Sequence, residues 1–386
     1  MKKIRNSTLK TIGPELPDYL EPKKRSLMGQ RNDLSYEHRR LELQTELSRH
    51  KLPDALQLLQ KQQMDIGFIF DDLSQVRYFQ CYGPGDSFFI GQYNPRRAER
   101  GRGAGRMVPP PGVATRTTPS TECFLCTNNI RWQSRGIQLY YQFPVGKNGS
   151  IYNALCNPFP FMPTHLTIAA VEHEPQSWQQ VSAWKTDKVT RIVTDLYDIA
   201  SQLPDYVGFY NGVGAGASIE EHFHYQFFQI PSGHGLFPLQ QVANTTEKRT
   251  KATAMLANEN ISTLVIDPRD YPLTSFRFSG GRNRMIGAAV ERVNKWDLLS
   301  GSSASANLSA IWENSELIMY LVPRNRFYSK SIGMAGTVGG LEALGEFIFC
   351  TEEENRIINS QGVNYNYMAT ILRGVKPPNV ERLNVR

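Results

Sequence analysis

The chain has 386 residues, of which 40% are hydrophobic and 20% charged, with a formal net charge of +7. This composition is ordinary for a globular protein with a sizeable core, and the length suffices for two domains or one duplicated domain. Five cysteines are sparse and odd in number, which argues against a disulfide framework.

No stretch reaches the roughly 18 apolar residues of a membrane-spanning helix, and the first 25 residues lack the apolar run of a signal peptide. We therefore expect a cytoplasmic protein. The positive charge fits a nucleic-acid binder or an enzyme for anionic small molecules. Eleven Lys or Arg against seven Asp or Glu lie in residues 1–50, and we favour a basic tail there over a nucleic-acid-binding arm.

The N-terminal quarter divides into a polar lead-in and a structured segment. Residues 1–34 are rich in charge and proline and predict a flexible lead-in. Helical spacing of apolar residues predicts a helix over 35–63, and "IGFIFDDLSQVRYFQ" (66–80) then predicts a pair of strands. The N-terminal helix and strands are thus expected to span 35–93.

Residues 94–120, "NPRRAERGRGAGRMVPPPGVATRTTPS", form the clearest break in the pattern. A long segment rich in Gly, Pro, Ser and Thr is either a solvated linker or an active-site lid. The segment contains six arginines that could close over phosphate groups: Arg96, Arg97, Arg100, Arg102, Arg106 and Arg116. Both interpretations stay open.

Strands and helices alternate irregularly in the rest of the chain. Strand patterns occur at 137–145 and 165–173, and apolar residues at helical spacing predict a long amphipathic helix over 175–203. "DYVGFYN" predicts a further strand, and three more follow in "STLVIDP", "NLSAIWE" and "ELIMYLVPR". This mixed order favours an α+β fold over a doubly wound sheet.

The stretch "EEHFHYQFFQ" (220–229) places polar and aromatic residues in alternation. In a strand, His222, His224 and Gln226 would share one face, and three aromatic side chains would share the other. A lone histidine would be interpreted as a core residue, but three polar groups in a row need partners or water. We therefore expect this face to carry chemistry.

A glycine-rich turn precedes that strand. "NGVGAGAS" (211–218) offers backbone N–H groups that can approach phosphate oxygens, with the Ser218 hydroxyl as an added donor. A glycine-rich run alone is weak evidence, but its position just before a His-x-His strand strengthens it.

Together, "NGVGAGASIEEHFHYQ" resembles the signature of the histidine-triad superfamily, in the branch where glutamine replaces the third histidine. That branch contains galactose-1-phosphate uridylyltransferases, diadenosine tetraphosphate phosphorylases and GDP-hexose phosphorylases. A second segment, "NPFPFMPTHLTIAAVEH" (157–173), matches the spacing of the other signature strand at Asn157, Pro160, His165 and His173. Looser similarity extends the resemblance over roughly residues 90–360.

The resemblance implies an α+β fold made of two histidine-triad-like halves, with antiparallel sheets and helices packed against them. The catalytic half would span 94–245, the second half 246–370, and a tail 371–386.

The resemblance also implies residue roles. His224 would be the nucleophile that forms a covalent nucleotidyl-histidine, and Gln226 would hold a phosphate oxygen. Asn157 would bind ribose hydroxyls. Ser218 would act with the backbone N–H groups of the turn, at Gly216 and Ala217, to stabilise charge on the same phosphate. Arg96 and Arg324 are expected to contact the nucleotide as well, and a structural salt bridge is the alternative for Arg324.

The implied function is nucleotidyl transfer, because glutamine cannot relay the protons that hydrolysis requires. The expected donor is a nucleoside-diphosphate sugar or a dinucleoside polyphosphate, and the acceptor phosphate or a sugar phosphate. The alternatives are hydrolysis of a nucleotide conjugate and a binding module without turnover. The sequence leaves open whether the chain forms a homodimer.

A Cys-x-x-Cys pair, Cys123 and Cys126, is alone compatible with metal binding, redox chemistry or chance. With His173 and His222 it reproduces a Cys₂His₂ set that holds structural zinc in some members of the superfamily. The remaining cysteines are expected in the core.

Two residues depart from the family pattern or stay ambiguous. Glu220 would share the histidine face, where it could bind a sugar hydroxyl or a metal, or point into solvent. His234 could line the pocket, but we favour a surface loop residue.

Overall fold

The computed structural model describes residues 36–69, 73–99, 123–131, 137–146, 149–179, 185–257 and 263–384. The predicted lead-in and most of the arginine-rich segment, including Arg100, Arg102, Arg106 and Arg116, lie outside the described residues.

One nine-stranded sheet forms the centre of the molecule, and the pairs of neighbouring strands within it are antiparallel. The first five strands in the order are β3 (Tyr140–Val145), β4 (Ser150–Cys156), β5 (Leu166–Ala170), β7 (His224–Gln229) and β6 (Tyr206–Asn211). The sheet continues through β10 (Ala304–Glu313), β11 (Glu316–Asn325), β9 (Ser275–Phe278) and β8 (Thr263–Ile266). Because β6 pairs with β10, the two predicted halves share a single sheet.

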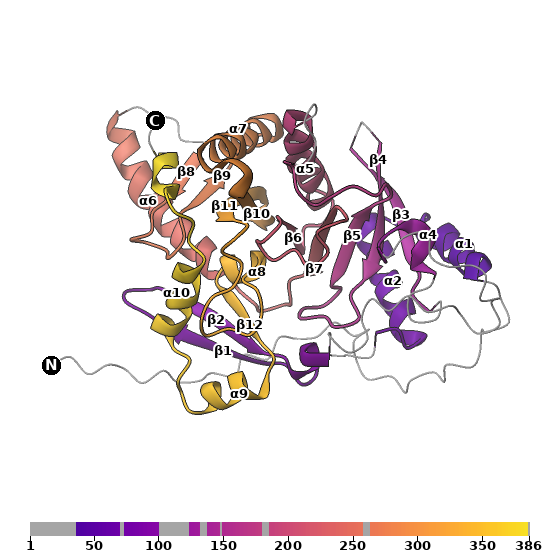
Figure 1. Ribbon diagram of the computed structural model, residues 1–386. Helices are drawn as coiled ribbons and strands as arrows, with labels where there is room; N and C mark the ends of the chain where they lie inside the picture. The colour runs from indigo at the N-terminus through magenta and orange to yellow at the C-terminus, as the bar shows by residue number, and fades with distance from the viewer. Residues whose placement is uncertain are drawn as a thin grey trace.

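A second, three-stranded sheet joins an early segment of the chain, residues 77–93, to a late one, residues 346–349 (Figure 1). The hairpin β1 (Arg77–Tyr82) and β2 (Phe88–Tyr93) pairs through β2 with the parallel strand β12 (Glu346–Phe349). The strand pair predicted at 66–80 is not present among the described residues of that range, where β1 begins at Arg77 and its partner β2 follows it.

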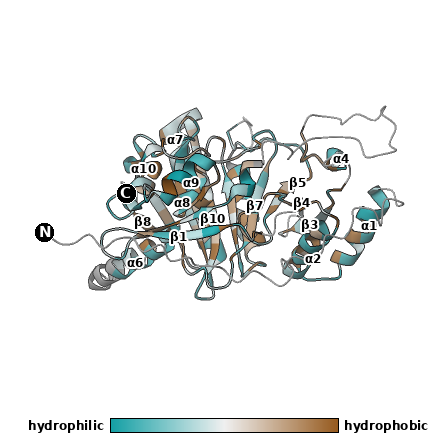
Figure 2. Cartoon of the chain, turned by 90° about the horizontal axis from the view of Figure 1, so that it is seen from below, coloured by the Kyte–Doolittle hydropathy of each residue, from teal (hydrophilic) through white to brown (hydrophobic). Residues whose placement is uncertain are grey.

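Helices cover the large sheet. α5 (Lys185–Ala200) and α7 (Arg282–Ser300) contact each other and pack on strands of both halves, while α1 (Tyr36–Leu47) and α2 (Leu52–Asp65) contact β3 and β4. The other helical segments are η2 (Pro95–Glu99), α4 (Thr127–Ile130), α6 (Pro238–Ala257), η4 (Gly301–Ser303), α8 (Gly340–Ala343), α9 (Glu352–Asn359), α10 (Tyr365–Gly374) and η5 (Val380–Asn384). In Figure 2 the central strands carry much of the hydrophobic colour, whereas α1 is largely hydrophilic.

The predicted α+β class is confirmed, and the sheets are mostly antiparallel, as predicted; the β2–β12 pair is the parallel exception among the described strands. Two helix predictions need correction. The helix predicted over 35–63 is two helices, separated at residues 48–51 with Pro53 in the first turn of the second. Within the described residues, the helix predicted over 175–203 is α5, Lys185–Ala200, and residues 174–179 are not helical, because residues 174–176 bond to the backbone of the segment before β7 and of β7 itself. Among the described helices, none combines the length and hydropathy that a membrane span requires.

His234 corrects another prediction, because it is not a surface residue. Its Nε2 lies 2.7 Å from Oε2 of Glu346, and the two side chains are only 4% and 0% exposed. Gln92 donates to the other carboxylate oxygen over 2.8 Å. A buried ion pair thus links the loop after β7 to β12, and the hydrogen bond from Gln92 links β2 to the same carboxylate.

This ion pair predicts a pH-dependent stability. Burial opposes the charge on His234, but the Glu346 carboxylate outweighs it and raises the pKa of the imidazole. Because the pKa of His234 is higher in the folded chain than in the unfolded one, protonation of His234 stabilises the fold. This stabilisation is fully present below pH 6.5 and is lost as the pH rises through the folded-state pKa. Glu346→Gln should cost about 1–3 kcal/mol at pH 6 and less at pH 8.5. Urea unfolding from pH 5.5 to 8.5 measures this; an equal cost at every pH would contradict it.

Candidate functional site

The alternation predicted for β7 and its approach is present. Phe223, Tyr225 and Phe227 are fully buried in the core cluster that also contains the apolar residues of α5. Across the sheet, His224 lies opposite Ala169 and Gln226 opposite Thr167 of β5. The strand itself begins only at His224, so residues 220–223 reach it through a turn.

His224 is held in one tautomer. Its Nδ1–H donates to the carbonyl oxygen of His222 over 2.8 Å, and His224 as a whole residue is only 2% exposed. With the proton fixed on Nδ1, the lone pair of the ring lies on Nε2. A neutral imidazole with its lone pair fixed in this way is a competent nucleophile near pH 7.

The glycine-rich turn follows β6 and is built against the second half. Gly214 and Gly216 have φ values of +66° and +99°. A Cβ on Gly216 would lie 2.4 Å from the Cα of Gly339, and one on Gly214 would lie 2.1 Å from the carbonyl oxygen of Arg326. Only glycine therefore fits, both for backbone conformation and for space.

Gly216→Ala should consequently destabilise the fold by about 2–4 kcal/mol, since it adds a backbone clash to an unfavourable φ. Gly233→Ala is the matched control, because its φ is +77° but no atom lies within 4 Å of an added Cβ. Thermal unfolding of both variants measures the difference. Equal losses of stability in the two variants would show that the clash with Gly339 adds nothing to the cost of Gly216→Ala.

Two asparagines carry the contact between the turn and the second half. Asn307 donates from Nδ2 to Oδ1 of Asn211 over 2.8 Å and to the carbonyl oxygen of Ala215 over 2.6 Å. The N–H of Gly340 donates to the same Oδ1 over 2.9 Å. Sequence analysis missed both asparagines, although Asn211 begins the glycine-rich motif.

Arg324 lies behind this contact and is fully buried. Its Nη1 donates to Oδ1 of Asn307 over 2.7 Å and to the carbonyl oxygen of Val338 over 2.8 Å. Burial lowers its pKa to about 10, so it stays charged at neutral pH. This geometry favours support of the turn through Asn307 over the predicted contact with a phosphate.

The predicted ribose-binding residue, Asn157, follows β4. Its Oδ1 accepts from the N–H of Phe159 over 2.9 Å, which shapes the turn that contains it. Arg97 donates to the carbonyl oxygen of Phe159 over 2.7 Å and lies over the Phe161 ring. The predicted phosphate ligand Arg96 is its neighbour in η2 and is half-buried. The start of the arginine-rich segment thus packs beside the Asn157 turn.

Ser218 and Glu220 lie in the exposed part of the turn before β7. Glu220 accepts a hydrogen bond from the N–H of Gly214 over 3.2 Å. The carboxylate therefore braces the glycine-rich turn, a role outside the three that the sequence left open.

The predicted metal-binding residues come together. One ligand atom from each of Cys123, Cys126, His173 and His222 lies within 4.8 Å of the others. The Cys123 Sγ–His222 Nδ1 distance is 3.3 Å and the Cys126 Sγ–His173 Nδ1 distance is 3.2 Å. In tetrahedral zinc sites with Zn–S near 2.3 Å and Zn–N near 2.0 Å, ligand atoms lie roughly 3.3–3.8 Å apart. The cluster could hold a metal ion.

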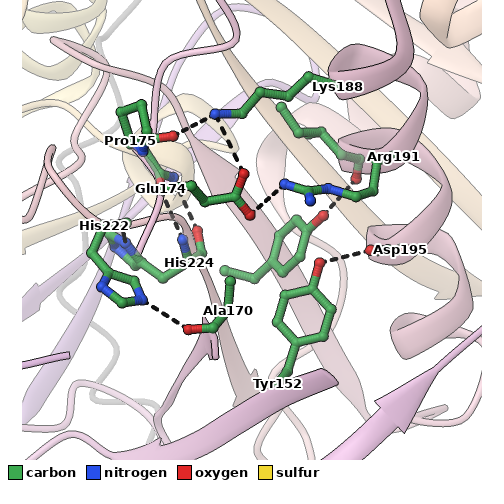
Figure 3. Close-up of polar contacts among 12 residues, drawn as sticks. Tyr152, Ala170, Glu174, Pro175, Lys188, Arg191, Asp195, His222 and His224 are labelled. Atoms are coloured by element: carbon green, nitrogen blue, oxygen red, sulfur yellow. Dashed lines mark hydrogen bonds and ion pairs between the residues drawn. The ribbon is translucent and has the colours of Figure 1, made fainter. Parts of the chain in front are cut away.

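The protonation chemistry of the cluster also fits a cation. His222 donates from Nε2 to the carbonyl oxygen of Ala170 over 2.8 Å (Figure 3). This leaves Nδ1 on the side of the cysteines, 3.3 Å from Sγ of Cys123. Burial lowers the pKa of His222 and raises that of the Cys123 thiol to about 11. The imidazole is thus ready to bind a metal, whereas a cation must displace the thiol proton.

Comparison with known proteins places this geometry in context. A family model described as a domain of unknown function (DUF4922) matches residues 58–229. No curated protein matches the sequence. The structure of yeast Ap4A phosphorylase Apa2 in complex with AMP aligns over 86% of this chain and 99% of its own, with 14% identity and a TM-score of 0.55.

The chain has the fold of that phosphorylase. The predicted likeness to diadenosine tetraphosphate phosphorylases is therefore confirmed for the fold alone. A GALT-like protein from Arabidopsis thaliana aligns over 75% of this chain and 96% of its own, with 13% identity and a TM-score of 0.32. That score is too low to add to the assignment. At such identities the reaction has to be argued from the site.

Proposed function

We propose that this protein is a nucleotidyltransferase of the phosphorylase type, acting through a covalent nucleotidyl-histidine on His224. The observation that carries the proposal is the fixed tautomer of His224, with its lone pair on Nε2, on the strand that follows a glycine-rich turn. The shared fold with a phosphorylase solved in complex with AMP supports it.

The reaction proceeds in two displacements. Nε2 of His224 attacks the α-phosphorus of the donor, and the bond to the bridging oxygen breaks. The leaving group departs with that electron pair and takes its proton from solvent. An oxygen of the acceptor phosphate then attacks the same phosphorus, and the phosphorus–nitrogen bond breaks to return the electron pair to Nε2.

The turn and the neighbouring polar residues bind the nucleotide. The N–H groups of Gly216 and Ala217 and the Ser218 hydroxyl stabilise charge on the reacting phosphate, and Gln226 donates to one of its oxygens. Asn157 binds the ribose, and Arg96 adds positive charge from η2. Gln226 cannot transfer protons, which favours phosphate or a sugar phosphate over water as acceptor.

The Cys123, Cys126, His173 and His222 cluster is proposed to hold one structural zinc ion. The ion would tie the 123–126 turn to the residues after β5 and before β7. Four protein ligands leave no open coordination position, so its contribution is to stability and not to the reaction.

Incubation with candidate donors tests the activity. The panel consists of GDP-, UDP- and ADP-hexoses and diadenosine tetraphosphate, each with and without inorganic phosphate, and chromatography separates the products. Nucleoside diphosphate formed only with phosphate present is the expected result. Nucleoside monophosphate formed in water alone would instead show a hydrolase. If no donor were turned over with either phosphate or a sugar phosphate as acceptor, the protein would be a nucleotide-binding module without catalytic activity.

A further inference from the structure

The ladder between β6 and β7 stops short of the reactive histidine. The two strands pair from Tyr206 opposite Gln229 to Phe209 opposite Gln226. Continued in the same register, the next residues would bring Asn211 opposite His224. At that position the side chain of Gln176, which belongs to neither strand, lies between the two backbones.

The Gln176 carboxamide replaces the missing ladder bonds. Its Oε1 accepts from the His224 N–H over 2.8 Å, and its Nε2 donates to the His224 carbonyl oxygen over 2.9 Å. The same Nε2 donates to the carbonyl oxygen of Asn211 over 2.8 Å. All three residues are buried, so no water can substitute for these bonds. β6 and β7 can thereby separate where the glycine-rich turn begins.

Gln176 is itself fixed at both of its backbone groups. Its N–H donates to the Glu220 carbonyl oxygen over 2.9 Å, and its carbonyl oxygen accepts from the Tyr210 hydroxyl. The residues before it are held by α5, since Lys188 donates to the Pro175 carbonyl oxygen over 2.6 Å and Arg191 pairs with Glu174 (Figure 3). The carboxamide is therefore presented to His224 by a rigid segment.

We propose that Gln176 is a positioning residue for His224, which sets the direction of Nε2 by clamping both peptide groups of the histidine. The proposal rests on the nucleotidyl transfer proposed above. The imidazole is fixed by the His222 carbonyl oxygen, so its orientation depends on the backbone of 222–224. Displacement of a reacting atom by about 1 Å lowers rates by roughly 100-fold.

Gln176→Met tests the inference, because methionine fills a similar volume without hydrogen bonds. Its control is Gln179→Met, which removes bonds of 2.7 Å to Asp297 and to the Gly301 carbonyl oxygen from the same segment. Gln176→Met should lower the single-turnover rate of nucleotidylation roughly 10- to 100-fold, with nucleotide affinity changed less than about threefold. Gln179→Met should keep the rate.

Hydrogen exchange of the His224 amide, followed by mass spectrometry of peptides spanning 222–229, gives a readout that needs no substrate. We expect faster exchange at His224 in Gln176→Met only. Slow exchange in Gln176→Met would show that the Gln176 side chain does not hold the His224 backbone, and this result would count against the proposal whether or not the donor panel finds turnover. Faster exchange with an unchanged rate, or a parallel loss of rate and affinity, would overturn the positioning role while leaving the proposed activity intact.

Discussion

Replacement of His224 by alanine should lower turnover of the active donor by at least roughly a thousandfold. The alanine variant has no nitrogen to accept the nucleotidyl group, so the two-displacement route is closed. Nucleotide binding should fall far less, because the turn N–H groups, Asn157 and Gln226 remain. Steady-state kinetics with the donor identified by the panel, together with nucleotide titration, separate the two effects.

His234→Gln is the matched control for this experiment. It alters another buried histidine, ten residues further along, whose partner is Glu346 and not a residue of the proposed site. It should change stability and keep turnover. If His224→Ala retained a tenth or more of the parent rate while folded, His224 would not be the nucleophile.

Removal of one cysteine from the metal cluster has the second largest expected effect. Cys126→Ser should abolish binding of one zinc ion per chain and lower the free energy of unfolding by about 3 kcal/mol or more. The reason is that the proposed ion would join three separate segments, around residues 123–126, 173 and 222, and an ion that binds the folded chain alone stabilises it. Metal analysis and urea unfolding measure the two quantities.

Cys350→Ser provides the comparison, since Cys350 is a half-buried cysteine that is not part of the cluster. It should keep the metal content of the parent. A strong chelator should lower the melting temperature of the parent and of Cys350→Ser, and leave Cys126→Ser unchanged. Zinc-free parent protein with the same melting temperature before and after chelator would rule out a structural ion.

The sequence predicted the reactive strand because its signal is local. Alternation of His224 and Gln226 with Tyr225 and Phe227 follows directly from the pleat of a strand, which in the structure begins at His224. The Cys₂His₂ cluster was predicted from a family resemblance, which relates Cys123 to His222 although they lie 99 positions apart in the chain. Neither conclusion required knowledge of the rest of the fold.

The helix prediction over 175–203 failed because hydrophobic spacing does not distinguish a helix from a loop buried beside it. Trp178 is buried in the same core cluster as Ile192 and Leu196 of α5, so it extends the apolar pattern without being helical. The polar residue that matters in this segment, Gln176, bonds to residues 35 and 48 positions away. No local pattern reports such partners.

Long-range pairing also explains the error at His234 and the ambiguity at Arg324. His234 reads as a loop residue in sequence, but its partner Glu346 lies 112 positions away. Arg324 reads equally as a phosphate ligand or a salt bridge, and only the fold shows that it bonds to Asn307 and the Val338 carbonyl oxygen. The pairing of β2 with β12 has the same character, because it joins segments some 250 residues apart.

The most direct test of the account is a search for the covalent intermediate. The protein is mixed with the active donor without phosphate, quenched in base to preserve a phosphoramidate, and analysed by intact and peptide mass spectrometry. We predict an added mass of one nucleotidyl group, equal to a nucleoside monophosphate less one water, on the peptide that contains His224; the adduct disappears when phosphate is added before the quench. Full turnover in phosphate without any such adduct, or an adduct on another residue, would contradict transfer through His224.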